Sequence, residues 1–274
     1  MTDFSKLLNP EQCAAATAGD GPLLVLAAAG TGKTRTLVHR VAYLIENSVP
    51  AERIMLLTFT NRAAKEMRER AAAVVGDEVS AIWSGTFHSI CARFLRRYGT
   101  AIGFQPGFQI LDEEDQKKLI GDIIKSSVAN PKEFPKKELV AKMISEAANE
   151  QKPVGFIASR WMTKTAGVDP EAITVIAEKY SVRKLELGAM DFDDLLVNGL
   201  KLLKTQDRIR EMLQEHFLHV LVDEYQDTNT LQAEFTDILA AKHRNIMAVG
   251  DDFQCIYTWR GAQIENILEF PRHV

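Results

Sequence analysis

Short apolar runs alternate with amphipathic helical patterns at both ends of the chain. The runs lie at residues 22–27, 53–59, 79–87, 217–224 and 245–252. A helical pattern follows each of the first three runs, beginning with the one from Lys33 to about Asn47, and another separates the last two. Strands that alternate with helices predict a parallel sheet covered by helices, which is an α/β fold.

The pattern changes between residues 96 and 204. Amphipathic helical segments such as EEDQKKLIGDIIKS and PKKELVAKMISEAANE are separated by prolines, and no convincing strand occurs. We therefore predict an all-helical insertion at 96–204 inside a sheet-containing domain made of residues 1–95 and 205–274.

Composition narrows both the cellular compartment and the class of protein to which the chain can belong. The chain has 274 residues, of which 46% are hydrophobic and 26% charged, as in ordinary globular proteins. Three scattered cysteines argue against a disulfide framework or a cysteine zinc site and favour a reducing, cytoplasmic setting. No signal segment and no apolar run of about 20 residues appears, so no membrane partner is expected.

Charge is unevenly distributed although its net value is only -4. Residues 31–100 contain 11 Lys/Arg and 6 Asp/Glu, whereas residues 205–274 contain 6 and 12. Such a mild basic bias is usually just a solvated surface, so it permits a phosphate-backbone partner without identifying one.

A candidate phosphate loop, AAAGTGKT, occupies residues 27–34. Backbone N–H groups of such a loop surround phosphates, its lysine adds positive charge, and its Ser/Thr hydroxyl reaches Mg²⁺. Ala27 stands where the strict pattern has glycine, which leaves a chance glycine-rich strand end as the alternative. The strand before the loop and the helix after it favour phosphate binding. The predicted nucleotide contacts here are Ala29, Gly30, Thr31, Gly32, Lys33 and Thr34.

A second candidate site is VLVDEYQDTN at 220–229, where an apolar strand ends in Asp223 and Glu224. At the carboxyl edge of a parallel sheet, one carboxylate can hold Mg²⁺ and its neighbour can activate water. Alternatively, the pair caps the helix that begins near Thr228. DFDD at 191–194 fits helix capping better than metal binding.

Aromatic residues at strand ends suggest a nucleic-acid surface. Phe59, Tyr257 and Trp259 each have polar or basic neighbours, and Trp259 precedes Arg260 and Gly261. Flat rings stack on bases of any sequence, although aromatic residues at strand ends more often belong to a core.

The ordered motifs LNPEQ, AAAGTGKT, LLTFTNRAAKEMRER, GTFHSICARFLRR, DFDDLL, VLVDEYQDTN and VGDDFQCIYTWRGA span nearly the whole chain. With them the chain resembles superfamily 1A DNA helicases of the UvrD/Rep/PcrA type. Alanine is common in that family at the position of Ala27, whereas Ala28 departs from the usual glycine. The resemblance implies a RecA-like P-loop NTPase fold with ATP and Mg²⁺ as cofactors.

The resemblance also implies roles for individual residues. Lys33 would contact the β/γ-phosphates, Thr34 and Asp223 would hold Mg²⁺, Glu224 would act as the base and Gln254 would sense the γ-phosphate. Gln12 would read the adenine edge, with a helix-start role after Pro10 as its alternative, and Arg35 would lie near the base and sugar. The implied DNA-binding residues are Phe59, Thr60, Asn61, Arg62, His88, Tyr257, Trp259 and Arg260.

Taken together, the resemblance implies the N-terminal ATP- and single-stranded-DNA-binding portion of a 3′-to-5′ helicase of repair or replication. Its expected partners are single-stranded DNA, single-strand/duplex junctions and a second, C-terminal RecA-like domain that this chain lacks. Alone, the chain is expected to hydrolyse ATP weakly. The alternatives are the motor portion of a RecB/AddA-like helicase-nuclease and a DNA-binding module without turnover.

Overall fold

The computed structural model describes residues 2–163, 169–251 and 270. These residues form two compact units. One unit takes its residues from 1–90 and 203–274, and the other from 91–202. The first unit is therefore made of two segments of the chain, and the residues of the second unit lie between them in the sequence.

The first unit is built on a five-stranded sheet with the strand order β1-β7-β6-β2-β3. Every neighbouring pair of strands is parallel. The strands are β1 Leu23–Leu26, β2 Ile54–Thr58, β3 Trp83–Thr86, β6 His219–Val222 and β7 Ile246–Gly250. All residues of β2, β6 and β7 are buried, which explains why these strands read as continuous apolar runs.

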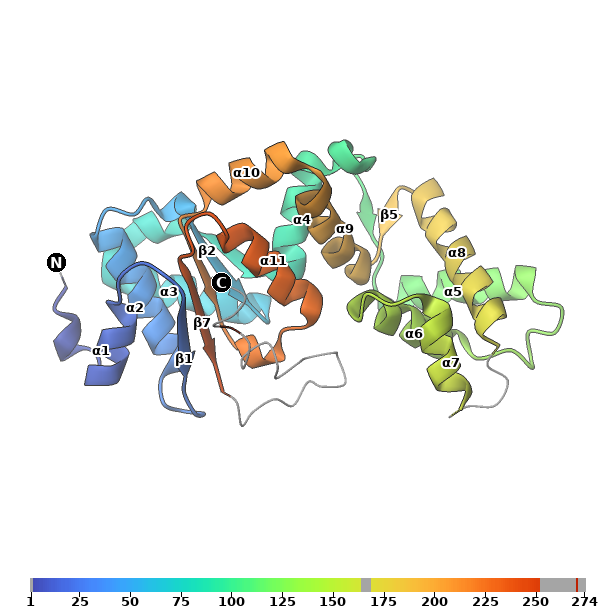
Figure 1. Cartoon of the computed structure of the whole chain (residues 1–274), viewed down its shortest axis with the longest axis horizontal. Helices are drawn as coiled ribbons and strands as arrows, with labels where there is room; N and C mark the ends of the chain where they lie inside the picture. Colours follow the sequence, from blue (N-terminus) through green and yellow to red (C-terminus); the bar gives the residue numbers. More distant parts are fainter. Residues whose placement is uncertain (1, 164–168, 252–269, 271–274) are drawn as a thin grey trace. The chain divides into compact units, whose positions relative to one another are not determined.

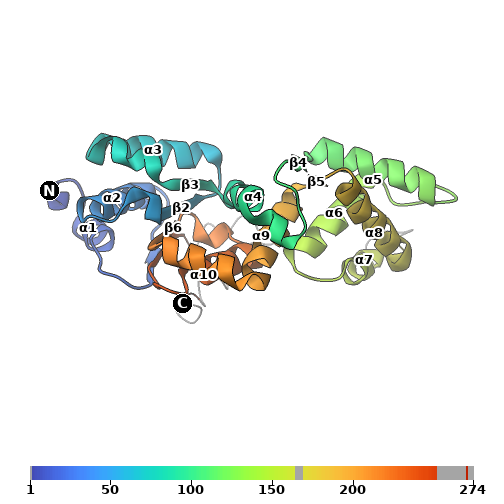
Figure 2. The same cartoon turned by 90° about the horizontal axis from the view of Figure 1, so that it is seen from above.

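Helices cover both faces of this sheet (Figures 1 and 2). On one face lie α1 Pro10–Ala16, α2 Lys33–Glu46 and α3 Asn61–Val75, and on the other lie α10 Asp207–His216 and α11 Thr230–Ala240. The core between α2, α3 and the sheet contains Leu37, Val41, Leu56, Met67, Leu221 and Val249. The predicted parallel α/β sheet is confirmed.

Two helices carry the chain between the units, namely α4 Phe87–Tyr98 and α9 Phe192–Thr205. Short 3-10 helices occur at Phe4–Lys6, Ala51–Arg53, Gly76–Ala81, Gly99–Ile102 and Tyr225–Asp227. The segment expected as a strand at 79–87 is thus partly helical, because Val79 and Ile82 are apolar for burial in the core rather than for strand pairing.

The second unit is helical, with α5 Glu113–Ser127, α6 Lys137–Asn149, α7 Val154–Met162 and α8 Pro170–Glu186. Its core includes Ile120, Val140, Ile157, Ile173 and Tyr180. A short parallel ladder between β4 Gln109–Ile110 and β5 Ala189–Met190 was not expected. Two residues per strand are too few to produce a recognisable alternating pattern.

The DFDD segment caps α9, as predicted. The carboxylate of Asp191 accepts a hydrogen bond from the Asp194 N–H at 2.8 Å, and that of Asp194 accepts one from the Asp191 N–H at 3.0 Å. Buried Lys184 lies 2.6 Å from the Asp191 carboxylate, which also accepts a hydrogen bond from the Tyr180 hydroxyl. These carboxylates are therefore paired inside the helical unit.

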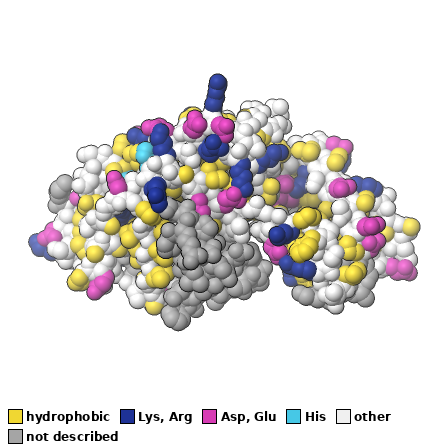
Figure 3. All heavy atoms as spheres, in the orientation of Figure 1, with side chains coloured by type: hydrophobic (Ala, Val, Ile, Leu, Met, Phe, Trp, Pro, Cys, Tyr) yellow, Lys and Arg dark blue, Asp and Glu magenta, His cyan; other side chains and the backbone are white. Residues whose placement is uncertain are grey.

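No helix among the described residues combines the length and apolar character needed to cross a bilayer. On the face shown in Figure 3, acidic and basic side chains are interspersed.

Candidate functional site

The carboxyl ends of all five parallel strands lie at one edge of the sheet. The segments that leave this edge carry most of the residues singled out from the sequence. The loop of residues 27–32 follows β1, Asp223 and Glu224 follow β6, and Asp251 follows β7. Ligands of open α/β sheets bind at such an edge.

The loop of residues 27–32 makes its turns at glycines. Gly30 and Gly32 have φ of 75° and 96°, whereas Ala27, Ala28 and Ala29 have no positive φ. A Cβ at position 32 would lie 2.5 Å from Gln12 Nε2, the end of a flexible side chain that can shift, so it is the positive φ that favours glycine there. The alanines therefore occupy positions at which glycine is not needed.

Lys33 begins α2 and is buried, with only 8% of its side chain exposed. Its Nζ lies 3.7 Å from Glu224 Oε2 and 3.6 Å from Asp251 Oδ2, and it donates a 3.3 Å hydrogen bond to the carbonyl oxygen of Ala27. Lys33 thus lies close to carboxylates that follow β6 and β7, two strands far from it in the sequence. This cluster combines one cation with several acidic groups in a largely buried place.

Two carboxylates near Lys33 are buried with an oxygen that has no protein partner, namely Asp223 Oδ1 and Asp227 Oδ1. Burial and the nearby Glu224 charge raise the pKa of Asp223 to about 7, and the same two causes raise the pKa of Asp227 to about 6. A buried carboxylate that lacks a partner is costly unless a cation or a donor satisfies it. These atoms fit the binding of a cation.

Glu224 has a left-handed backbone, with φ 50° and ψ 47°. Such a conformation costs a non-glycine residue on the order of 1–2 kcal/mol and is typical of functional sites. Its carboxylate accepts a 2.8 Å hydrogen bond from Gln226 Nε2, and Gln226 Oε1 accepts a 3.0 Å hydrogen bond from the Asp251 N–H. Gln226 is almost completely buried.

Gln12 and Arg35 both lie beside the phosphate loop. Gln12 forms a capping box with Asn9 at the start of α1, as its helix-start alternative predicted. Its Nε2 also donates a 2.7 Å hydrogen bond to the carbonyl oxygen of Thr31. Arg35 is exposed and donates to the carbonyl oxygen of Leu7. Both side chains therefore connect the N-terminal segment to the loop or to the first turn of α2.

The remaining predicted DNA contacts divide into two groups. Phe59, Thr60, Asn61, Arg62 and His88 follow β2 and β3, two neighbouring strands in which Thr58 is paired with Thr86, so they leave the sheet at the same edge. Phe59 and His88 are partly exposed and the other three are exposed, while Thr60 Oγ1 also caps α3 by accepting from the Ala63 N–H. The second group, which consists of Tyr257, Trp259 and Arg260, lies outside the described residues, as does Gln254, the residue expected to sense the γ-phosphate.

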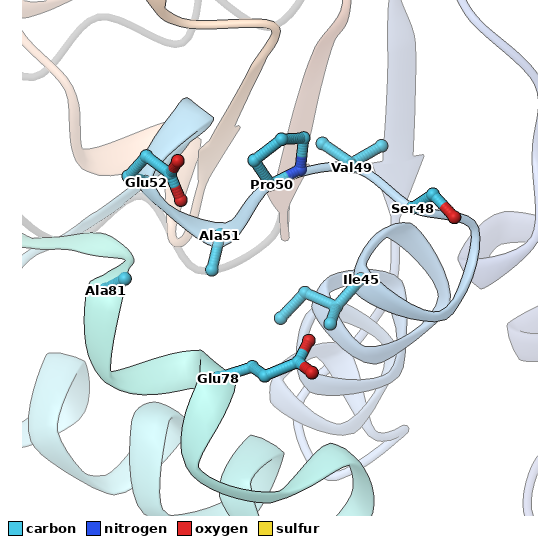
Figure 4. A pocket seen from close by; sticks show the side chains of 8 residues that line it. All are labelled: Ile45, Ser48, Val49, Pro50, Ala51, Glu52, Glu78 and Ala81. Carbon is cyan, nitrogen blue, oxygen red and sulfur yellow. The ribbon is translucent and has the colours of Figure 1, made fainter.

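A hollow elsewhere on this unit does not fit a nucleotide (Figure 4). It is lined by Ile45, Ser48, Val49, Pro50, Ala51, Glu52, Glu78 and Ala81. Ile45 lies near the end of α2, twelve residues beyond Lys33 and therefore roughly 18 Å along the helix axis. Two acidic side chains and no basic one line the hollow, so phosphate would be repelled.

Comparison with known proteins agrees with this geometry. Residues 8–274 match the UvrD/REP helicase N-terminal domain. The chain belongs to this family. The ATP-dependent DNA helicase PcrA of Staphylococcus aureus (strain Mu50) is 39% identical over 266 residues, which are 97% of this chain and 36% of that protein. PcrA of Staphylococcus epidermidis (strain RP62A) is 40% identical over 271 residues, which are 98% of this chain and 36% of that protein.

The chain thus spans about a third of the length of these UvrD/REP relatives. Within that span, sequence reasoning missed three residues of the site, Gln226, Asp227 and Asp251. The signal that could have found Asp251 is the one that found Asp223, a polar residue directly after a buried strand. Gln226 gave no such signal, because its role depends on the turn that follows β6.

Proposed function

We propose that this chain is the ATP- and single-stranded-DNA-binding portion of an ATP-dependent DNA helicase. The observation that carries this proposal is the cluster at the sheet edge, where buried Lys33 faces Glu224 and Asp251 beside the partnerless oxygen of Asp223. The binding and hydrolysis of a nucleoside triphosphate require a lysine after a loop that turns at glycines, together with acidic residues at the ends of neighbouring strands. This cluster contains both.

The residues present fit a magnesium nucleotide. The N–H groups of the loop at 29–34 would surround the phosphates, and Lys33 would exchange its contacts with Glu224 and Asp251 for the β/γ-phosphates. Thr34 and Asp223 would hold Mg²⁺, whose charge would neutralise the phosphate oxygens during transfer. Gln12 and Arg35 flank the loop at the positions proposed for the adenine and sugar.

Glu224 is proposed to orient the attacking water and to accept its proton. Its side chain is 35% exposed, so water can reach it, while its backbone and the Gln226 amide fix its direction. Lys33 would stabilise the negative charge that develops on the γ-phosphate. Gln254, proposed to sense that phosphate, follows Asp251 by three residues in the sequence.

Single-stranded DNA is proposed to cross the segments after β2 and β3. Phe59 would stack on a base, and Thr60, Asn61, Arg62 and His88 would contact phosphates and bases. Tyr257, Trp259 and Arg260 are proposed to extend this surface. The partial exposure of Phe59 supports the proposal, because a core role would have buried its ring.

For the full-length protein we propose 3′-to-5′ translocation and unwinding at single-strand/duplex junctions during cytoplasmic DNA repair or replication. Residues 1–95 and 205–274 would form the first RecA-like domain, and residues 96–204 its helical insertion. A second RecA-like domain would supply arginines to the γ-phosphate. Loss of such an arginine reduces phosphoryl transfer on the order of 10³–10⁵-fold, so efficient turnover requires both domains.

The test is ATP hydrolysis by the full-length protein with Lys33→Ala. This change removes the charge proposed to stabilise the γ-phosphate, so the DNA-stimulated kcat should fall by about 10² or more. Lys65→Ala, which removes an exposed lysine of α3, is the matched control and should retain turnover. Near-normal hydrolysis by the Lys33 variant would refute the proposal, and a wild-type protein that binds DNA without turnover would favour a binding module.

A further inference from the structure

Gln226 joins two segments of the site that are far apart in the sequence. Its side chain lies in the short helix after β6, and 1% of the residue is exposed. One end of its amide contacts the carboxylate of Glu224 at 2.8 Å, and the other contacts the backbone of Asp251, directly after β7, at 3.0 Å.

The chemistry of the two partners fixes which way the amide points. The backbone N–H of Asp251 can only donate, so the amide oxygen of Gln226 must face it. The amide NH₂ then faces Glu224, whose carboxylate accepts. An amide in this buried place has one arrangement that satisfies both ends, and it directs a donor to the carboxylate.

Glu224 needs such a restraint. Its backbone has a left-handed conformation, and roughly a third of its side chain is exposed. Lys33 is its other close polar partner at 3.7 Å, and the proposed function requires Lys33 to turn toward a phosphate. Gln226 would then be the contact that keeps the carboxylate in place when nucleotide binds.

We propose that Gln226 is a positioning residue that holds the Glu224 carboxylate for water activation and couples it to the backbone at the end of β7. The inference rests on the proposed function. A shift of the Asp251 backbone moves the amide, and the amide moves the carboxylate. Asp251 leads directly into the sequence that contains Tyr257, Trp259 and Arg260, so DNA bound there can act on hydrolysis through this amide.

Two variants of the full-length protein separate this role from simple packing. Gln226→Glu keeps the shape and the acceptor for the Asp251 N–H, but replaces the donor with a second negative charge beside Glu224. Gln226→Met keeps the approximate volume and removes both hydrogen bonds. Gln232→Met is the matched control, because Gln232 is also buried and hydrogen-bonded but caps α11 through Asn229 and does not contact Glu224.

The measurements are the affinity for an ATP analogue and kcat with and without single-stranded DNA. Both Gln226 variants should bind the analogue within about two-fold of wild type yet lose about ten-fold or more of DNA-stimulated kcat, with a smaller loss without DNA. Gln232→Met should lower the melting temperature and keep kcat. If Gln226→Met fails to fold, Gln226→Glu decides.

Wild-type-like DNA-stimulated kcat in a folded Gln226 variant would overturn the inference and leave the proposed function intact. An equal loss of kcat with and without DNA would overturn the coupling to β7. Failure of the wild-type protein to hydrolyse ATP in response to DNA would instead contradict the proposed function itself. The three results are therefore distinguishable in one set of assays.

Discussion

Individual residues at the sheet edge are arranged for charge binding at the expense of local stability. Asp223 is buried with an unsatisfied oxygen, and Glu224 has a left-handed backbone. Neither feature helps the chain to fold without ligands. In the proposed function, a cation and a nucleotide would satisfy these groups, and the same features would then favour ligand binding.

Asp223 predicts a specific pH dependence of folding. Because burial raises its pKa to about 7 in the folded protein, the folded state binds more protons than the unfolded state between pH 4 and pH 7. The contribution of Asp223 to the free energy of unfolding is therefore largest below about pH 4 and falls as pH rises to about 7.

Asp223→Asn removes this titration. As pH rises from 4 to 8, the free energy of unfolding of the variant should increase relative to that of the wild type by about 1–3 kcal/mol. The measurement is denaturant unfolding without divalent cations. Asp122→Asn, at an exposed position of α5, provides the control and should show no such trend. A wild-type-to-variant difference that is constant with pH would contradict the burial of a carboxylate with a partnerless oxygen at position 223.

Sequence could predict where Lys33, Asp223 and Glu224 lie, because Lys33 begins a recognisable helix and the two acidic residues directly follow a recognisable strand. It could not predict the Gln226 bridge. That contact depends on the left-handed turn at Glu224 and on the end of β7, and neither the turn nor the register of β6 against β7 is visible in local residue patterns.

Among the elements, helix α2 connects the phosphate loop to the core and ends in a strained turn. The Ser48 N–H donates to the Ile45 carbonyl oxygen at 2.9 Å and the Val49 N–H to the Leu44 carbonyl oxygen at 3.0 Å, while Ser48 has φ 66°. This is the position at which glycine is preferred after a helix.

Ser48→Gly should therefore stabilise the protein. The expected gain is about 0.5–1 kcal/mol, because glycine adopts positive φ without steric cost. The gain would appear as a higher melting temperature of the unit that contains α2. Ser48→Ala retains the Cβ and should give no gain. A glycine variant no more stable than wild type would show that the turn is not strained.

Strands were predicted best where every residue is buried and the sequence is therefore a continuous apolar run, as in β2, β6 and β7. They were predicted less well where apolar residues serve another element, as at Val79 and Ile82 before β3. The β4–β5 ladder escaped prediction for a related reason, since its pairing is nonlocal and only two residues long. The pattern of apolar residues in a sequence indicates which residues are buried more directly than it indicates the backbone conformation.

For the whole molecule, the main organising feature is the division into two units by an insertion. The change from strand–helix alternation to helices alone is the sequence feature from which we predict an insertion at 96–204. The borders were harder to place, because α4 and α9 run through them without a break in sequence pattern. Folding the two outer segments together brings Lys33 close to two acidic groups that lie about 200 residues away in the sequence.

We propose that one sheet edge binds both nucleotide and DNA, and the most direct test is ATP hydrolysis by the full-length protein with and without single-stranded DNA. Turnover should rise with DNA. In Phe59→Ala, the DNA concentration needed for stimulation should increase by about ten-fold, because base stacking contributes roughly 1–3 kcal/mol, while turnover without DNA stays unchanged. Hydrolysis that is equal with and without DNA, or stimulation that Phe59→Ala leaves intact, would contradict it.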